Sequence, residues 1–458
     1  MTFLPFLIVF VLAIVGYIIN VRAANAVRNS GNRLHSISLY HGLYSLFIIF
    51  FPLTILILIW LIFEGPLLDR IVYQSLSPEY TANIGVGAQQ LIIAEIHSIA
   101  RGLVFGEPED WKIKAAEVYI QWQNLSKNAL FFTTIVTCVV LLFWSRTKVR
   151  HSFRARQNVE KIVTWVMISC SVVAIFTTVG IIASLLFETI RFFSLVPISE
   201  FLFGLNWEPQ IPIREDQVAG KGAFGFFPVI LGTLVITVIA VFISVPVGLM
   251  SAIYLNEFAP PSIRSMSKPV LEVLAGVPTV VYGFFAVLVV APAIGNLGDS
   301  LGLSIAPNTA LAAGSVMGIM IIPFISSFAD DALSAVPKTL RDGSLALGAT
   351  RAETMMLVLF PAAIPGIVGG ILLAVSRAIG ETMIVVMAAG LIAKLTINPL
   401  DSVTTVTVQI VSLLIGDTSF DNPKTLAAFA LGMMLFLITL AINVIALSIV
   451  QKYREIYD

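Results

Sequence analysis

The chain has 458 residues and a formal net charge of zero, because 27 basic residues balance 27 acidic ones. Hydrophobic residues make up 58% of the sequence, charged residues only 12%, and the mean hydropathy is +0.95. A soluble domain of this length requires far fewer apolar residues. The composition therefore excludes an ordinary soluble protein. It predicts a polytopic membrane protein in contact with lipid, and we expect no nucleic acid among its partners.

Nine apolar segments have about the length needed to cross a bilayer. A helix needs about 20 mainly apolar residues to cross a hydrocarbon core about 30 Å thick. The runs are continuously apolar, whereas the strands of a membrane barrel would alternate, so we expect an all-α fold. The segments lie near residues 3–21, 43–63, 129–144, 162–187, 226–255, 270–292, 309–329, 362–389 and 425–450.

The positions of Lys and Arg predict the orientation of these spans, because short loops rich in positive charge stay in the cytoplasm. The first and third loops are basic, whereas residues 64–128 between them are mainly acidic. Nine crossings then place the N-terminus outside, the C-terminus inside and residues 330–361 in the cytoplasm. The basic residues are Arg22, Arg28, Arg33, Arg146, Lys148, Arg150, Arg154, Arg156 and Lys161, and the acidic ones are Glu64, Asp69, Glu79, Glu95, Glu107, Glu109, Asp110 and Glu117.

The first apolar run has one feature of a secretory signal. Ala24-Asn25-Ala26 has the small-x-small form of a cleavage site. However, Met1-Thr2-Phe3 contains no basic residue, and the positive charge follows the run instead of preceding it. We therefore expect an uncleaved anchor that crosses from outside to inside.

The chain divides into two unequal parts at a basic linker, Ser145 to Lys161. Residues 1–158 contribute three spans and a polar segment near 64–128, and residues 159–458 contribute six spans joined mostly by short loops. Within the polar segment, residues 88–105 have apolar side chains on one side and charged ones largely elsewhere. This pattern predicts an amphipathic helix that lies on the membrane or on the core.

A polar segment near 334–361 separates two of the apolar runs. Pro337 is well placed for the first turn of a short helix, Leu340 to Leu347 can continue it, and Gly348 supplies a flexible stop. A second helical stretch follows from Thr350 to Phe360. The segment is either a docking surface for a soluble partner or a connecting loop, and its spacing alone does not decide between them.

Arg377 and Glu381 lie inside the eighth apolar run, where charge is expensive. Residues four apart share one face of a helix, so we expect the guanidinium and the carboxylate to pair. The pair either marks a substrate route or locks two helices together. A neighbouring strip of small residues at the same spacing would allow close helix approach, including approach to a second subunit: Gly366, Gly370, Ala374 and Ala378.

The polar segment near 334–361 resembles the cytoplasmic coupling loop of bacterial binding-protein-dependent ABC importer permeases. In that family a Glu-Ala-Ala start is followed by Gly and, further on, by Leu-Pro. Here Gly348 and Pro361 occupy the glycine and proline positions, and Phe360 occupies the leucine position. The start is Asp342-Gly343-Ser344, which departs from Glu-Ala-Ala. The resemblance implies that these five residues, Asp342, Gly343, Ser344, Gly348 and Pro361, couple the chain to an ATPase.

Further stretches resemble the PstC-type permeases of phosphate importers. They are residues 201–209, 222–233 and 255–285, together with RAIGETMIVVMAAG from Arg377 to Gly390, so the resemblance covers about 162–458. It implies a six-helix permease core in a bacterial inner membrane, with 1–158 as an N-terminal extension. It also implies a second related permease, an ATPase dimer, a periplasmic phosphate-binding protein and inorganic phosphate as partners.

The resemblance places ATP hydrolysis in a separate subunit. The one Gly-Lys pair, Gly220-Lys221, does not fit a phosphate-binding loop. Cys138 and Cys170 lie inside predicted spans, and the four histidines have no metal-ligand spacing, so we expect no cofactor, no metal site and no catalytic residue. Arginine suits phosphate because it stays charged and offers forked donors. We therefore expect Arg377, held by Glu381, on the substrate pathway.

Two other functions fit the sequence less well. An importer permease of the same architecture could carry a different oxyanion, although the combined motifs favour phosphate. An ion-coupled secondary transporter would show inverted repeats and broken central helices instead of a coupling loop. A role in phosphate sensing is a further alternative that uptake and signalling assays would separate.

Overall fold

A computed structural model describes residues 4–30, 34–76, 86–103, 109–210, 222–303, 305–415 and 422–453. Arg33, Glu79, Glu107 and the Gly220-Lys221 pair lie outside these residues. Within the described residues, nine helical segments are long and apolar enough to cross a membrane, which confirms an all-α, multi-pass membrane protein. They are Pro5–Asn29, Ser38–Ser75, Asp110–Thr147, Ala155–Leu195, Phe227–Phe258, Thr279–Ser300, Ala310–Ser334, Arg351–Ile379 and Pro423–Lys452.

The chain forms two compact units, Met1–Phe176 and Thr177–Asp458. Their boundary falls inside one long helix, α6 (Ala155–Leu195), and not in the basic linker that precedes it. These units are defined by contacts within the structure and do not test a functional division. The division between an N-terminal extension and a permease core at 158/159 therefore stays a prediction. Each unit is described by itself below.

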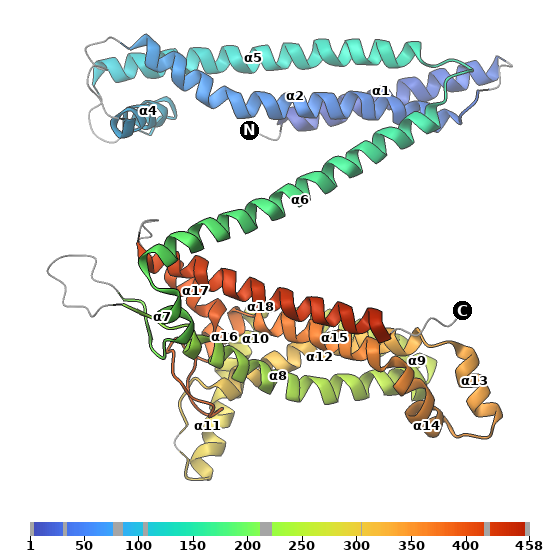
Figure 1. The fold of residues 1–458 in the computed structure, drawn as a ribbon. Helices are drawn as coiled ribbons and strands as arrows, with labels where there is room; N and C mark the ends of the chain where they lie inside the picture. Colours follow the sequence, from blue (N-terminus) through green and yellow to red (C-terminus); the bar gives the residue numbers. More distant parts are fainter. Residues whose placement is uncertain are drawn as a thin grey trace. The chain divides into compact units, whose positions relative to one another are not determined.

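Three long helices of the first unit run side by side: α1 (Leu4–Asn29), α2 (Ser38–Ser75) and α5 (Asp110–Thr147) (Figure 1). Apolar side chains such as Val9, Leu53 and Cys138 fill the space between them. Asn20 is fully buried there and donates hydrogen bonds to Ser45 Oγ at 2.9 Å and to Ser145 Oγ at 3.3 Å. One amide thus joins all three helices, in a setting where unpaired polar groups are costly.

The predicted amphipathic helix is present as α4 (Val86–Ala100) and packs on α5. Its Ile96 is buried beside Val72 and Ala115. On its polar side, His97 Nε2 lies 2.8 Å from Asp69 Oδ1, and Glu95 pairs with Lys112 at 2.6 Å. Its apolar side therefore covers the helix bundle of its own unit, and a membrane-surface role stays a prediction.

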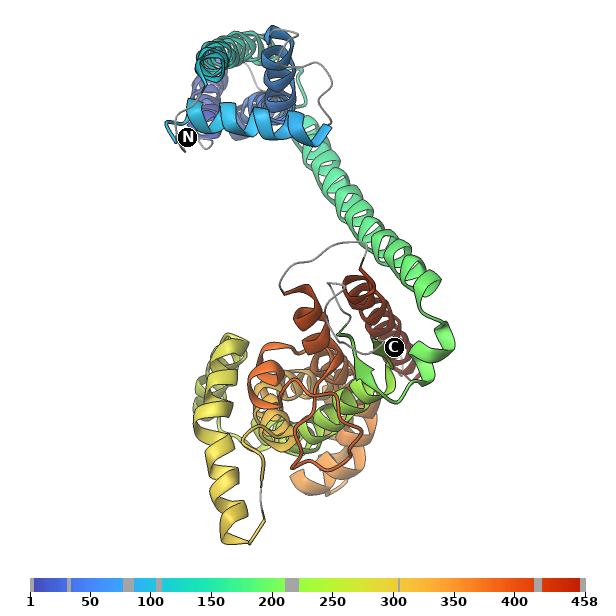
Figure 2. The ribbon, with the colours of Figure 1, turned by 90° about the vertical axis from the view of Figure 1, so that its left-hand side faces the viewer.

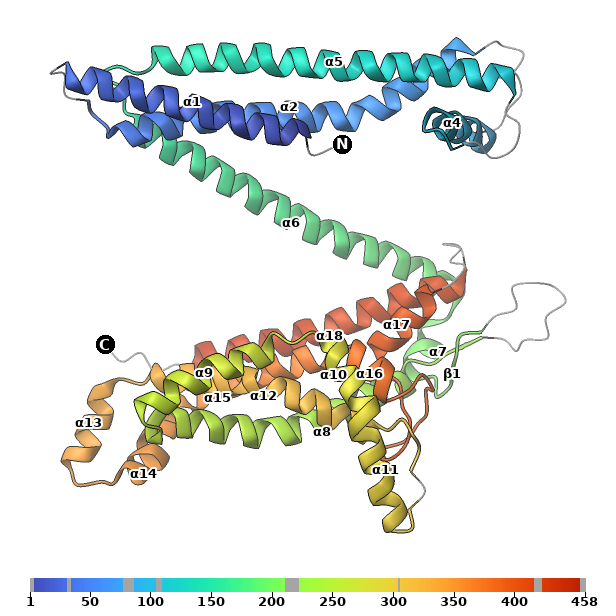
Figure 3. The ribbon, with the colours of Figure 1, turned by 180° about the vertical axis from the view of Figure 1, so that it is seen from behind.

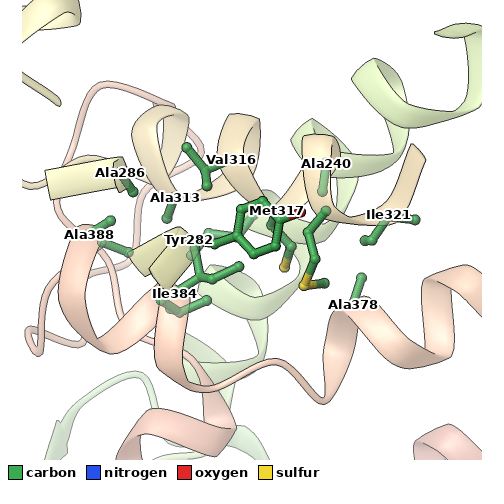
Figure 4. Packing of buried hydrophobic residues seen from close by; sticks show 14 of the residues in the cluster. Ala240, Tyr282, Ala286, Ala313, Val316, Met317, Ile321, Ala378, Ile384 and Ala388 are labelled. Carbon is green, nitrogen blue, oxygen red and sulfur yellow. The ribbon is translucent and has the colours of Figure 1, made fainter. Parts of the chain in front are cut away.

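The core of the second unit is built on two adjacent helices, α8 (Phe227–Ile253) and α12 (Ala310–Ser334). Small residues allow this contact: a Cβ added at Gly318 would lie 3.0 Å from the Ala240 carbonyl oxygen. Figure 4 shows the apolar cluster around Met317, which α10 (Thr279–Phe285) joins through Tyr282. The core therefore depends on close helix packing, as expected between helices in lipid.

The remaining helices of this unit complete the bundle, with α11 turned away from it (Figures 1 and 2). The short π-helical segments η2 and η3 interrupt two spans, and a third, η1, ends the span that begins with α8. Their bounds are η1 Tyr254–Phe258, α9 Pro261–Ala275, η2 Ala286–Val290, α11 Ala291–Ser300, α13 Lys338–Ala346, α14 Arg351–Thr354, η3 Met355–Leu359, α15 Phe360–Ile379, α16 Met383–Ala388, α17 Val406–Leu414 and α18 Pro423–Tyr453.

Two predicted spans are interrupted. The run near 270–292 breaks between α9 and α10, where Gly276 caps α9 and Pro278 precedes α10. The run near 362–389 ends as a helix at Ile379, and α16 begins only at Met383. Both breaks lie in mainly apolar sequence, so hydropathy alone does not show them. Proline lacks an N–H for the helical ladder and glycine is a poor helix former, which favours a helix end at these points.

A small antiparallel sheet and an aromatic cluster form one end of this unit, together with α7 (Ile198–Phe203), α16 and α17 (Figure 3). The strands are β1 (Trp207–Glu208) and β2 (Ala223–Phe224). The opposite end carries α13 and α14 (Figure 3). The polar segment near 334–361 thus lies at the end of this unit opposite the small sheet. Arg377, in the last turn of α15, lies beside Phe324, near the middle of α12.

Candidate functional site

The polar segment folds as predicted into two short helices with a glycine between them. Pro337 leads into α13, and Gly348 follows it with φ +92°, a conformation that favours glycine. Thr350 then caps α14: its side chain accepts a hydrogen bond from the Glu353 N–H, and the Glu353 carboxylate accepts one from the Thr350 N–H. This capping box fixes where the chain turns back toward the membrane-spanning helices. We call residues 337–361 the coupling segment, after the role that the resemblance predicts for them.

The five residues expected to couple to an ATPase are distributed along this segment. Asp342 and Gly343 are exposed on α13, and Gly348 is exposed in the turn. Ser344 Oγ lies 3.0 Å from Thr354 Oγ1, which joins α13 to α14. Pro361 is exposed in the first turn of α15.

The coupling segment presents a large free surface. None of the nine residues of α13 is buried, and Leu347 next to it is 92% exposed. The rest of this chain therefore leaves the Leu347 side chain uncovered. A docking role for this surface stays a prediction.

Arg377 and Glu381 do not pair in the described structure, so the expected ion pair on a shared helix face is wrong. The helix α15 ends at Ile379, and Gly380 caps it. Glu381 therefore lies beyond the helix, where its Oε1 accepts hydrogen bonds from the N–H groups of Met383 at 3.0 Å and Ile384 at 3.4 Å. The carboxylate caps the start of α16 and does not serve the arginine.

Arg377 is exposed and has an aromatic neighbour instead of a carboxylate. Its guanidinium carbon lies 5.4 Å from the centre of the Phe324 ring, a cation–π contact. It also lies in the last turn of α15, where the partial negative charge of the helix end favours a cation. These two effects lower the cost of the charge and leave the forked donors available for an anion.

The strip of small residues on α15 packs within this chain. A Cβ at Gly366 would lie 2.8 Å from Cβ of Ala332, and one at Gly370 would lie 2.6 Å from Cβ of Phe328, both on α12. Ala374 and Ala378 are buried in the core cluster (Figure 4). The strip therefore brings α15 against α12, and it is not available for contact with a second subunit.

The residues that the structure describes hold no group of three or more His, Cys, Asp or Glu side chains that could bind a metal ion. Cys138 is buried and Cys170 is exposed, and both are free thiols. The sequence analysis missed a cluster of polar residues behind α13 that includes Asp330 and Arg341.

Two family models match the chain. Residues 244–455 match the model described as the binding-protein-dependent transport system inner membrane component, and residues 6–177 match one described as a phosphate ATP-binding cassette transporter. The second match ends at the boundary between the two compact units. The sequence motifs had shown no specific signature in this N-terminal part.

Curated relatives agree with these matches. A probable ABC transporter permease protein, YqgH of Bacillus subtilis, is 33% identical over 60% of this chain and 85% of its own length. The phosphate transport system permease proteins PstC of Haemophilus influenzae and Xylella fastidiosa are 32% and 31% identical, over 82% and 76% of their lengths. The chain is thus a membrane permease of the ABC transporter class. Within that class it belongs to the PstC-type permease family.

Proposed function

We propose that the chain is the permease subunit of an ATP-driven phosphate importer, in which it forms half of the translocation pathway. The observation that carries this proposal is the combination of PstC-type relatives with a folded, exposed coupling segment. The other half comes from a second related permease. ATP is hydrolysed by a separate dimer of ATPase subunits, and a periplasmic binding protein delivers the phosphate.

The coupling segment is the proposed contact with the ATPase. Its position at the end of the unit opposite the small sheet agrees with an orientation in which α13 faces the cytoplasm. In this orientation the N-terminus is periplasmic and the C-terminus cytoplasmic, as the basic loops predict. Leu347 and the exposed face of α13 around Asp342 and Gly343 supply the docking surface, while Gly348 and Pro361 set its shape.

Arg377 is the proposed phosphate contact of this subunit. Its guanidinium is exposed and has no carboxylate partner in the described structure. The forked donors of an arginine can bind two oxygens of a tetrahedral anion. A single site of this kind binds weakly enough to release the anion again, as a transport pathway requires. Glu381 contributes by capping α16 next to the pathway.

The test is uptake of radiolabelled phosphate by cells that lack their own importer and carry the complete operon. Uptake should require this subunit, resist competition by sulfate and fall by about a hundredfold in Arg377→Ala, since the lost charge-assisted contacts are among the strong ones. Arg101→Ala is the matched control, because Arg101 is an exposed arginine outside the second unit. Uptake that sulfate abolishes would assign a different oxyanion. Uptake that does not need the subunit would reject the proposal.

A further inference from the structure

Asp330 is a nearly buried carboxylate close to the end of α12, with a side chain only 6% exposed. Its Oδ1 accepts a hydrogen bond from Asn256 Nδ2 at 2.7 Å and lies 3.3 Å from Arg264 Nη2, and its Oδ2 pairs with Lys268 Nζ. Asn256 belongs to η1, whereas Arg264 and Lys268 belong to α9. One carboxylate therefore binds two other elements to α12.

A second set of contacts joins α13 to the same place. Arg341 Nη2 lies 2.8 Å from Glu257 Oε2 and 3.4 Å from Asn256 Oδ1, and the Glu257 side chain is also only 6% exposed. Asn256 uses both ends of its amide, because its Nδ2 donates to Asp330 and to Ser334 Oγ at 2.9 Å. The amide of Asn256 thus lies between the arginine of α13 and the carboxylate of α12. We call these six residues the Asp330 cluster: Asn256, Glu257, Arg264, Lys268, Asp330 and Arg341.

Besides Arg341, contacts with α14 and η3 position α13. The helix has nine residues, none of them buried, and a helix this short does not form stably by itself in water. Leu340 is partly buried against the apolar cluster around Leu333, and Ser344 bonds to Thr354. Arg341 supplies the polar connection from α13 to η1. A shift of α13 must therefore carry η1 with it or break the contacts of Arg341.

The far side of the cluster leads toward the proposed pathway. The helix α9 holds Arg264 and Lys268 and ends at the break before α10. Across this break, the Tyr282 hydroxyl donates a hydrogen bond to the Leu274 carbonyl oxygen at 2.8 Å. Tyr282 belongs to the same buried cluster as Ala378, the residue after Arg377 (Figure 4). Continuous contacts thus run from α13 through the Asp330 cluster to the end of α15.

We infer that Asp330 is a positioning residue through which movement of α13 is passed to α9 and on to the pathway. This inference rests on the proposed function, in which α13 meets the ATPase. The placement of Asn256 and Glu257 on a π-helical segment agrees with it, because such segments are frequent at functional sites. Hydrogen bonds and ion pairs depend on geometry, so a displacement of α13 changes the contacts that Arg341 makes with Asn256 and Glu257.

The experiment uses the complete importer reconstituted in liposomes. Samples with the phosphate-loaded binding protein on the periplasmic face of the importer are compared with samples that lack it. Basal ATPase activity, its stimulation by the loaded binding protein and phosphate transport are measured together. Asp330→Asn should keep basal hydrolysis and lose about tenfold in stimulation and transport, the usual size of a coupling effect. Asp331→Asn is the matched control: it makes the same charge change at the next residue, which is exposed and has no side-chain hydrogen bond or ion pair among the described residues.

Exchanging the charges of the pair Arg341 and Glu257 distinguishes a coupling role of the Asp330 cluster from a role in stability alone. Arg341→Glu and Glu257→Arg should each lower the ratio of stimulated to basal hydrolysis, and the double variant should recover most of it. A merely structural role would lower assembly and both activities equally, which would overturn the inference. Normal stimulation in Asp330→Asn beside an active wild type would also overturn it. Wild-type importer that transports no phosphate would instead overturn the proposed function.

Discussion

Asp330 and Arg377 are charged residues on two packed helices of the second unit, and their surroundings are opposite. The carboxylate of Asp330 is almost completely buried and has three polar partners from two other elements. The guanidinium of Arg377 is exposed and has one aromatic neighbour. A buried carboxylate with all its partners in place holds parts of the protein together, whereas a charge without a counter-ion remains available for a ligand. The comparison separates a coupling role from a substrate role.

Charge reversal at Arg377 should give the largest effect. Arg377→Glu should lower phosphate uptake by at least about a hundredfold, because a like charge on the pathway repels the anion. Arg377→Lys should retain part of the uptake, since it keeps the charge and loses the fork. Uptake of radiolabelled phosphate at equal membrane levels measures both. Equal phosphate uptake by Arg377→Glu and the wild type would show that Arg377 has no substrate role that distinguishes it from Asp330.

Glu381→Gln tests whether Arg377 depends on this carboxylate. The amide oxygen of Gln can still accept from the N–H groups that begin α16, so we expect phosphate uptake within about threefold of wild type, the cost of a weakened cap. A loss as large as that of Arg377→Ala would show that the two side chains act as a pair during transport.

The sequence predicted the local fold of the coupling segment, two short helices around Gly348, but it did not predict the Asp330 cluster. Pro337, Gly348 and the capping residue Thr350 are local signals, because each acts on the backbone within a few positions. The Asp330 cluster joins residues such as Arg264 and Arg341, which are far apart along the chain. One sequence contains no record of such contacts. A usable signal was the position of Asp330 at the end of an otherwise apolar run, where a charge calls for a partner.

The predicted pairing of Arg377 with Glu381 failed for a related reason. Residues 362–389 are mainly apolar, so the run was interpreted as one continuous span, whereas its helix ends at Ile379. Gly380 was a visible signal, because a glycine before a polar residue is common at helix ends. The strip that starts at Gly366 was correctly predicted to allow close packing, and its partner is α12 of the same chain.

The packing of α15 on α12 connects the two charged residues, and Gly370→Leu should weaken it. A Cβ at this position would already lie 2.6 Å from Cβ of Phe328, so a larger side chain forces the helices apart. We expect destabilisation by about 1–3 kcal/mol, the usual cost of overpacking. Thermal unfolding of the purified chain in detergent, followed by circular dichroism, measures it. Gly343→Leu is the control, since a Cβ at Gly343 meets nothing within 4 Å. Equal melting of the two variants would contradict the packing argument.

Gly348→Ala should have a smaller effect, confined to the coupling segment. The glycine has φ +92°, so a side chain there costs about 1–2 kcal/mol of local strain. Hydrogen exchange of the amides in α13 should become faster while that of α12 stays unchanged. The ratio of stimulated to basal ATP hydrolysis should fall modestly, because the orientation of α13 relative to α14 becomes less defined. Unchanged exchange in α13 would show that the turn tolerates a side chain.

The smallest effect is expected at Asp401, in the loop that precedes α17. Hydrogen bonding from Thr396, and then the ammonium of Lys394, hold the pKa of the Asp401 carboxyl below its ordinary value of 3.8. A lowered pKa in the folded state means that the ionised carboxylate stabilises the loop above pH 3.8, and that this contribution is lost as the pH falls through the lower pKa.

Hydrogen exchange of the amides between Lys394 and Asp401 should therefore be faster in Asp401→Asn than in wild type at pH 7, after correction for intrinsic rates. The difference should disappear below the pKa of the folded state, where both chains lack the charge. Asp299→Asn is the control, because that carboxylate is exposed and has no side-chain partner among the described residues. The Asp401 backbone carbonyl also accepts from the Ala310 N–H at 3.0 Å, at the start of α12. Equal exchange in the two chains at pH 7 would show that the loop is held by this backbone contact and not by the charge.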